Sequence, residues 1–197
     1  MGSSMRKGLV FLYAAALIVV LAMPGIADAR KFKIGVTTIV AHPALEADQQ
    51  GFEQALVDAG LEVDYDYQNA QGEMSNAQQI AQKFKNDSSI DLIHAIATPT
   101  AQAACKVIKN KPVVYSSVTD PVGAGLVSSL EAAGGPNGGN VTGVSDAWPI
   151  YEQMKLYSAM LPRVKTWGTV YNAGDANSVI SINRTKQACD KLGLELV

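Results

Sequence analysis

The feature that most constrains the fold of this chain is a regular alternation of strand and helix patterns that begins near residue 32. Short apolar runs typical of strands alternate, across brief polar turns, with segments whose apolar residues recur at helical spacing. The predicted strands are 32–37, 61–67, 91–97, 112–116, 140–144, 166–171 and 194–197, and the predicted helices are 44–59, one capped by Ser75, 101–108, 150–160 and 177–192. Repeated units of this kind predict a doubly wound α/β fold around a mostly parallel sheet.

Three segments add detail to this prediction. Residues 61–67 alternate strictly between apolar and polar side chains, which predicts a strand near the edge of the sheet. Residues 91–97 are almost continuously apolar and predict an interior strand, so His94 within them is interpreted as a packed residue rather than a ligand. Ser75 followed by Gln78 matches a capping box, and the buried stripe of its helix is expected to be Ala77, Ile80, Ala81 and Phe84.

The first 29 residues have the three-part layout of a secretory signal peptide. Arg6 and Lys7 form a basic start, an apolar run follows from Leu9 to Leu21, and Ala27-Asp28-Ala29 ends it with small residues. The run is shorter than the roughly 20 residues that cross a bilayer, which favours cleavage near Ala29 over a membrane anchor. The chain is therefore expected to work in the periplasm or outside the cell, where ATP and reduced nicotinamide are not available.

Charge and cysteine content narrow the function classes further. The chain has 16 Lys and Arg against 18 Asp and Glu, a formal net charge of −2, and no basic block, so nucleic acid is not an expected partner. Cys105 and Cys189 each fall on the apolar stripe of a predicted helix, which predicts two buried free thiols. The sequence contains no metal-ligand or nucleophile motif, so we expect no metal, no cofactor and no catalytic group.

Polar residues gather where the predicted strands end, which is where doubly wound sheets bind ligands. Most of them are neutral hydroxyls and amides, with two acids and neither Lys nor Arg. Hydroxyls and helix N-termini can hold a carboxylate, and a nearby Asp can pair with an ammonium, so this chemistry suits a small zwitterion such as an amino acid. The alternative is that the same residues act only as caps and turns, which are their ordinary roles.

Five segments, in order, resemble the substrate-binding proteins of ABC transporters of the tryptophan/tyrosine type. They are IGVTTIVAHPALEADQQGFEQALVDAG (34–60), ATPTAQAA (97–104), TDPVGAGLV (119–127), GGNVTGVSD (138–146) and YNAGDANSV (171–179). The resemblance implies a type I periplasmic-binding fold, in which two α/β lobes joined by a hinge trap a small ligand and dock on a membrane permease. Ligands of this group tend to be aromatic amino acids.

The resemblance also implies a set of cleft residues and a division of the chain. The matching cleft positions are Thr38, His42, Thr98, Thr100, Ser116, Thr119, Asp120, Ser145, Asp146, Asn172 and Ser178. Residues 30–145 correspond to a complete first lobe, and the pattern restarts over 146–197 as the start of a second lobe. Because such proteins are longer, the second lobe is expected to be truncated at Val197.

The leading hypothesis is a secreted solute-binding protein that captures an amino acid, which the resemblance implies is aromatic, and delivers it to an ABC import permease. Branched-chain amino acids, purines and sugars remain open as ligands. One alternative is a ligand-sensing module for a signalling partner. Another is a secreted enzyme on the same fold, although no catalytic constellation is found.

Overall fold

The computed structural model describes residues 31–131 and 139–197 of the 197-residue chain. The predicted signal peptide, residues 1–29, lies outside the described residues. Over the part of the chain that is described, no helix combines the length and apolarity that a membrane crossing requires. Strands and helices alternate along both described ranges, as predicted.

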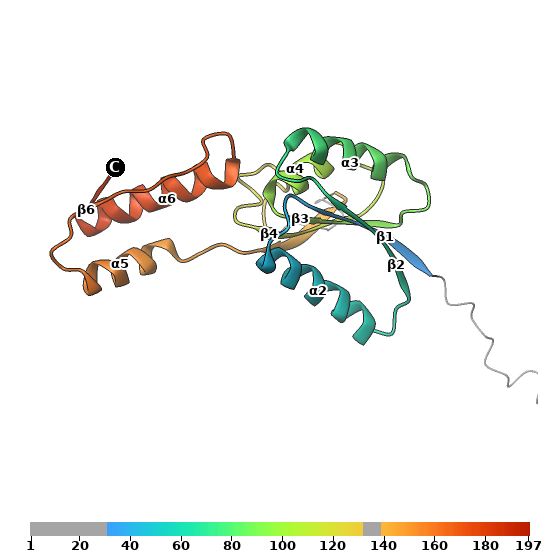
Figure 1. Ribbon diagram of the computed structural model, residues 1–197, viewed down its shortest axis with the longest axis horizontal. Helices are drawn as coiled ribbons and strands as arrows, with labels where there is room; N and C mark the ends of the chain where they lie inside the picture. Colours follow the sequence, from blue (N-terminus) through green and yellow to red (C-terminus); the bar gives the residue numbers. More distant parts are fainter. Residues whose placement is uncertain (1–30, 132–138) are drawn as a thin grey trace, which may run out of the picture. The chain divides into compact units, whose positions relative to one another are not determined.

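A five-stranded parallel sheet forms the centre of the fold (Figure 1). Its strand order is β2-β1-β3-β4-β5, so the chain winds outward in both directions from β1. This topology confirms the doubly wound α/β fold and places the alternating strand at an edge and the apolar strand inside. The strands are β1 Phe32–Thr38, β2 Val63–Asn69, β3 Leu92–Ile96, β4 Val113–Val118 and β5 Val141–Ser145.

Helices cover both faces of this sheet (Figure 1). Helix α2 (Pro43–Asp58) packs Leu45, Phe52 and Leu56 on one face. Helices α3 (Met74–Asn86) and α4 (Thr98–Val107) cover the other face, where most of the buried apolar residues lie. Burial on both faces explains why the inner strands are almost continuously apolar.

Helix α3 confirms its predicted stripe but not its predicted cap. Ala77, Ile80, Ala81 and Phe84 are its buried residues, and a Cβ on Gly35 would lie 3.0 Å from the Phe84 ring, so glycine permits this close approach to β1. The N-cap is Glu73, without a side-chain hydrogen bond, and Ser75 lies inside the first turn. The capping-box prediction is wrong because the chain has already turned at Gln71 and Gly72, both with positive φ, before the helix begins.

Helix α4 begins at Thr98, three residues earlier than the predicted start at residue 101. Pro99 lies in its first turn, where a missing N–H costs no hydrogen bond. Thr98 and Thr100 therefore belong to the helix and are buried, rather than lying in an open turn. The strand predicted over 112–116 also ends too early, because β4 continues through an irregular register to Val118.

The C-terminal residues form a second, smaller sheet. Helix α5 (Ile150–Met160) has the predicted bounds, and α6 (Ala176–Leu192) ends at Gly193, whose φ is +66°. Strands β6 (Thr166–Trp167) and β7 (Glu195–Leu196) pair in parallel. The strand predicted over 166–171 is therefore too long, because residues 168–171 form no ladder.

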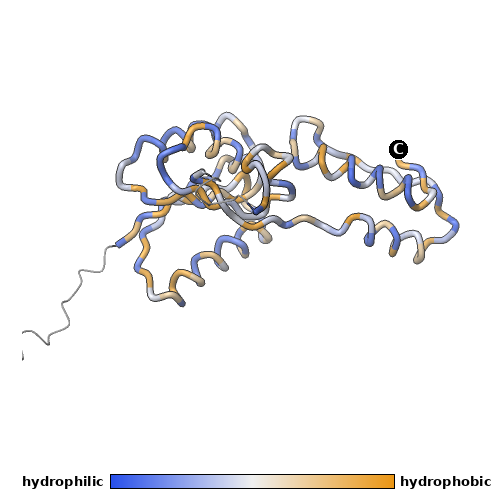
Figure 2. The backbone as a smooth tube through the Cα atoms, turned by 180° about the vertical axis from the view of Figure 1, so that it is seen from behind, coloured by the Kyte–Doolittle hydropathy of each residue, from blue (hydrophilic) through white to orange (hydrophobic). Residues whose placement is uncertain are grey.

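We refer to residues 32–145 as the N-terminal region and to residues 146–197 as the C-terminal region. In Figure 2, hydrophobic and hydrophilic stretches alternate along α6, as expected of a helix with one buried stripe. Cys105 on α4 and Cys189 on α6 are buried and free, which confirms the prediction of two packed thiols. Burial raises the pKa of the Cys105 thiol to about 11, so this thiol stays protonated at neutral pH.

Candidate functional site

The carboxyl ends of β1, β3, β4 and β5 meet at one edge of the five-stranded sheet, because all of its strands are parallel. Hydrogen bonds tie the residues that follow β4 and β5 together. The Thr119 hydroxyl donates to Asp146 Oδ1 at 3.1 Å, and the Ser145 hydroxyl donates to the Thr119 carbonyl at 3.1 Å. The structure therefore brings these three predicted residues into one cluster.

Backbone strain gathers at the same edge. Within the described residues, Gln71, Ala97 and Ser117 are the non-glycine residues with positive φ. Gln71 follows β2, Ala97 follows β3, and Ser117 lies near the end of β4. Such conformations cost on the order of 1–3 kcal/mol each and persist where the surrounding structure imposes them, often at binding sites.

The N-terminus of α4 offers unused hydrogen-bond donors. Its N-cap, Ala97, supplies no side-chain acceptor for the first turn. The Thr98 hydroxyl is buried and has no hydrogen-bond partner among the described residues, and the same holds for Thr37 on β1. Because helix N-termini and hydroxyls both favour negative charge, this part of the edge suits an anionic group such as a carboxylate.

Thr100 has a different role from Thr98. Its hydroxyl donates to the carbonyls of Ile96 and Ala97 at 2.5 and 3.0 Å, so it ties the first turn of α4 to the end of β3. The two threonines are both buried and two residues apart, yet only the Thr98 hydroxyl lacks a partner. Thr100 is therefore a structural residue of this edge.

Two consecutive serines of β4 are held from the face that α2 covers. The Ser117 hydroxyl donates to Asp48 Oδ2 of α2 at 2.6 Å, and Ser116 Oγ lies 2.7 Å from His94 Nε2. His94 is fully buried and its ring stacks on Phe52, with 4.0 Å between centroids, which confirms that it is a packed residue. Burial lowers the pKa of His94 to about 4, although the charge of Asp48 opposes this shift.

Asp120 is already engaged through both of its carboxylate oxygens. Oδ1 accepts the backbone N–H of Gly123 at 2.8 Å, and Oδ2 lies 2.8 Å from a guanidinium nitrogen of Arg184 on α6. The predicted strand-end residues include neither Lys nor Arg, but α6 supplies a cation to one of them. No local pattern marks Arg184, which is 64 residues from Asp120.

Three other predicted residues take local roles instead. His42 is the N-cap of α2, and its Nδ1 accepts the backbone N–H of Ala44 at 3.1 Å. The Asn172 side chain accepts the N–H of Gly174, and the Ser178 hydroxyl donates to Asp175, the N-cap of α6. These printed hydrogen bonds stay within a few residues of each side chain, as the capping and turn interpretation predicted.

A cavity of about 230 Å³ lies beside Thr38, at the carboxyl ends of β1 and β2 and the start of α2. The Tyr67 hydroxyl at its wall donates to Glu53 Oε1 at 2.9 Å, and burial together with this bond raises the pKa of Tyr67. Thr38 is the one predicted site residue in this lining. The cavity is lined by Val36, Thr38, Val40, Ala41, Leu45, Glu46, Gln49, Tyr67, Gln68 and Asn69.

The described side chains at this edge are of kinds that can bind charged groups. They combine hydroxyl and helix donors for an anion with the carboxylate of Asp146 for a cation, whereas the charge of Asp120 is already balanced by Arg184. Across residues 31–131 and 139–197, no three His, Cys, Asp or Glu side chains are grouped so that they could hold a metal ion. A small zwitterion is the ligand class that these donors and acceptors fit.

Comparison with known proteins identifies a family that this chain matches. The model of a family described as "ABC transporter substrate binding protein" matches residues 33–197. A curated protein named "Tyrosine-binding protein", from Clostridioides difficile (strain R20291), is 41% identical over 175 residues, which cover 86% of this chain and 49% of that protein. The match to the family model therefore extends over both the N-terminal and the C-terminal region.

Two solved structures are similar in both sequence and fold. A conserved domain protein from Vibrio cholerae O1 biovar El Tor has a TM-score of 0.80 and 42% identity. An ABC domain in complex with L-Trp from Streptococcus pneumoniae has a TM-score of 0.79 and 35% identity. Each comparison covers 85% of this chain and 56% of the other, so the chain spans about half the length of the relatives it matches.

Proposed function

The chain belongs to the family of ABC transporter substrate-binding proteins, with the type I periplasmic-binding fold, and on this premise we propose that it binds an aromatic amino acid for import. The observation that carries the proposal is the family match over residues 33–197, joined to an edge of the sheet that suits a zwitterion. One relative is named for binding tyrosine and another was solved with L-Trp, which favours an aromatic side chain on the ligand.

In this proposal the first turn of α4 binds the ligand carboxylate. The unpartnered Thr98 hydroxyl and the helix N-terminus, which lacks a side-chain cap, supply donors there. Ser116, whose backbone carbonyl accepts the Ala97 N–H at 3.0 Å, lies beside this turn and supplies a second hydroxyl. A carboxylate bound here satisfies a buried hydroxyl that otherwise has no partner.

The ammonium and the ring are assigned to neighbouring parts of the same edge. Asp146, which accepts from Thr119, supplies the negative charge for the ammonium, because the charge of Asp120 is already balanced by Arg184. The cavity beside Thr38 supplies apolar surface from Val36, Leu45 and Tyr67 for the aromatic ring.

We further propose that residues 30–145 form one lobe of a two-lobed binding protein, that 146–197 begin the other, and that ligand contacts with both stabilise a closed form. The closed protein would deliver its ligand to an ABC permease from the periplasm or the cell surface, after removal of residues 1–29. Binding without turnover is proposed because the named relatives are binding proteins. No cofactor takes part.

Calorimetric titration with L-tyrosine and L-tryptophan, with L-leucine and a sugar as comparison ligands, tests the proposal. An aromatic amino acid at 100 times its dissociation constant should also stabilise the chain by about 2.7 kcal/mol in thermal unfolding. Binding of leucine or the sugar in place of both aromatic amino acids would reject the assigned ligand class.

A pair of isosteric variants tests the carboxylate site. Thr98→Val removes a buried hydroxyl without a partner, so it should weaken amino-acid binding while leaving stability unchanged or raised. Thr100→Val is the matched control, because its hydroxyl bonds two carbonyls, and it should lower stability by about 1 kcal/mol. If the wild type and Thr98→Val bind the amino acid equally well, the ligand carboxylate does not bind at the Thr98 hydroxyl.

A further inference from the structure

His94 is a buried titratable side chain for which the proposed binding chemistry has no direct use. It lies on β3, is 0% exposed, and is covered by the ring of Phe52 from α2. One ring nitrogen, Nε2, is 2.7 Å from Ser116 Oγ. The other, Nδ1, is buried and has no hydrogen-bond partner among the described residues.

The unpartnered Nδ1 determines where the imidazole proton is favoured. If the proton were on Nδ1, a buried N–H would lack an acceptor, and buried N–H groups without partners are rare. Asp48 of α2, whose charge acts on His94, accepts the Ser117 hydroxyl at Oδ2. With the proton on Nε2, Nδ1 is left as a bare acceptor, which is the less costly of the two arrangements.

The tautomer of His94 in turn decides whether the Ser116 hydroxyl can donate a hydrogen bond to a ligand or can only accept one. When Nε2 donates to Ser116 Oγ, the hydroxyl hydrogen of Ser116 is free to be donated elsewhere. When Nε2 is bare, Ser116 must donate to it and can only accept from a ligand. Because a carboxylate is acceptor-only, the first arrangement alone lets Ser116 bind one.

We propose that His94 is a positioning residue that donates from Nε2 to Ser116 Oγ and thereby makes the Ser116 hydroxyl a donor to the ligand carboxylate. The inference rests on the proposed function, since it names how one residue of that site is set for its ligand. Its location agrees with this role, because Ser116 lies on the carboxyl half of β4 and its carbonyl bonds the N-cap of α4.

Nitrogen NMR on chain carrying labelled histidine tests the tautomer without any ligand. The chain has two histidines, so a His42→Asn variant, which keeps a good N-cap residue, assigns the His94 signals. We expect a protonated Nε2 and a bare Nδ1 near neutral pH. A protonated Nδ1 would overturn the inference, whatever the chain binds.

Binding of L-tyrosine and of tyramine, which lacks the carboxylate, tests the consequence. His94→Phe keeps a ring against Phe52 but removes the contact that fixes the Ser116 hydroxyl, so its hydrogen is no longer held toward the ligand, and it should weaken L-tyrosine binding by up to about tenfold while leaving tyramine binding unchanged. His94→Gln, whose amide can donate to Ser116, should recover part of that loss. Thermal unfolding of each variant checks that it is folded. If His94→Phe is not folded, binding of the two compounds by His94→Gln is used for the test instead.

A double-mutant cycle with Ser116→Ala separates positioning from packing. If His94 acts through Ser116, the double variant His94→Phe, Ser116→Ala should bind L-tyrosine as well as Ser116→Ala alone. Additive losses, or an equal loss of tyramine binding in His94→Phe, would overturn the inference. Failure of the wild type to bind either compound would count against the proposed function, and the NMR result would still decide the tautomer of His94.

Discussion

The N-terminal and C-terminal regions repeat the same strand–helix units, but they bury very different amounts of apolar surface. In the N-terminal region, two clusters fill both faces of the five-stranded sheet, and Phe84, Ile93, Ile96 and Ile108 are all fully buried. In the C-terminal region the buried cluster is Met154, Ala188, Cys189 and Leu194. Several large apolar side chains are exposed there, such as Met160 at 69% and Val170 at 98%.

The difference shows that helices and strands depend on their surroundings to different degrees. Helix α5 has its predicted bounds although one of its residues, Met154, is buried. Strand β6 is two residues long although six residues have a strand pattern. A helix makes its backbone hydrogen bonds within itself, whereas a strand extends only as far as a neighbouring strand pairs with it.

We expect the largest difference in free energy of unfolding between the two regions when one buried side chain in each region is replaced by alanine. Phe84→Ala removes a fully buried ring and should cost about 3–5 kcal/mol, whereas Met154→Ala in the small cluster should cost about 2 kcal/mol. Hydrogen exchange should show that Met154→Ala lowers protection in α5 and α6 but not in β1 and β3. Loss of protection throughout the chain would mean that both regions unfold as one unit.

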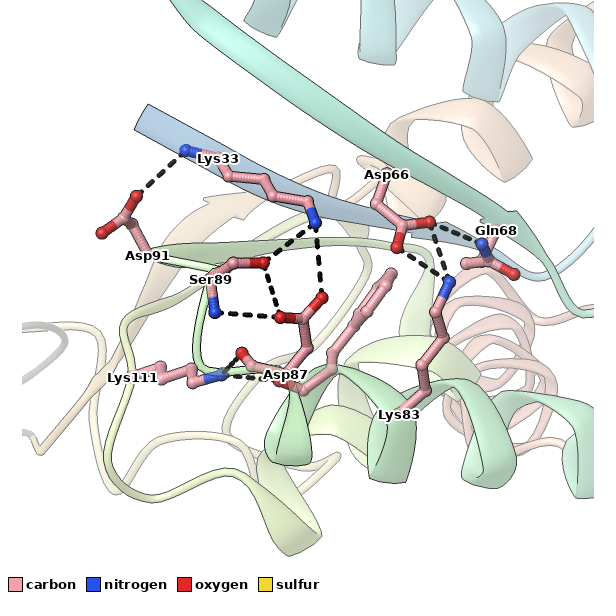
Figure 3. Close-up of polar contacts among 9 residues, drawn as sticks. Lys33, Asp66, Gln68, Lys83, Asp87, Ser89, Asp91 and Lys111 are labelled. Carbon is pink, nitrogen blue, oxygen red and sulfur yellow. Dashed lines mark hydrogen bonds and ion pairs between the residues drawn. The ribbon is translucent and has the colours of Figure 1, made fainter. Parts of the chain in front are cut away.

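A smaller effect is expected at the amino edge of the large sheet (Figure 3). The buried Lys111 donates to the carbonyls of Phe84 and Asp87 at the end of α3, at 2.7 and 2.5 Å, so Lys111→Met should cost about 1–3 kcal/mol in urea denaturation. Lys83→Met is the control, because its ion pair with Asp66 is partly exposed and should contribute about 1 kcal/mol or less. Equal costs would contradict the assigned role of Lys111.

The ion pair between the two regions should contribute less still. Arg184→Gln removes the partner of Asp120, and because both side chains are partly exposed we expect a loss of about 0.2–1 kcal/mol that shrinks in high salt. Hydrogen exchange in α6 should rise in this variant. Lys155→Gln breaks a pair within α5 and should leave exchange in α6 unchanged, so a matching rise there would contradict a specific link through Arg184.

The smallest expected effect is a pH dependence of stability that comes from Asp87 in the N-terminal region. The Ser89 hydroxyl, then its backbone N–H and Lys33, lower the pKa of Asp87 from 3.8 to about 2 (Figure 3). Because the folded pKa is the lower one, Asp87 contributes stability above about pH 4, which is lost as the pH falls toward 2. Ser89→Ala should raise this pKa without restoring 3.8, as carbon NMR of the carboxyl group can measure. An unchanged pKa of Asp87 in this variant would show that Ser89 is not the main cause of the lowered pKa.

Local patterns were enough to predict much of the fold. The order of strands and helices, the buried stripe of α3, the edge position of β2 and the packing of His94 all follow from the period and continuity of apolar residues. The caps were less predictable, because a cap depends on where the preceding turn ends. Ser75 matched a capping box, yet Gln71 and Gly72 had already set the start of α3.

In the candidate site, too, some residues could be predicted from the sequence and others could not. Residues such as Thr119, Ser145 and Asp146 were identified because parallel strands end at one edge, and the structure joins them by hydrogen bonds. Asp48 and Arg184 were not identified, because their bonds to Ser117 and Asp120 cross 69 and 64 residues of sequence. Which of the predicted residues contact a ligand stays a prediction.

The sequence by itself determined the class of fold and the edge at which polar residues gather, since both follow from side-chain periodicity and from the parallel direction of the strands. Only the tertiary structure decided how far each strand extends, which hydroxyls are used within the fold and which lack a partner. It alone distinguishes Thr98 from Thr100 and places His94 against Ser116. Hydrogen-bond partners depend on distances across the chain, and a local pattern carries no information about those distances.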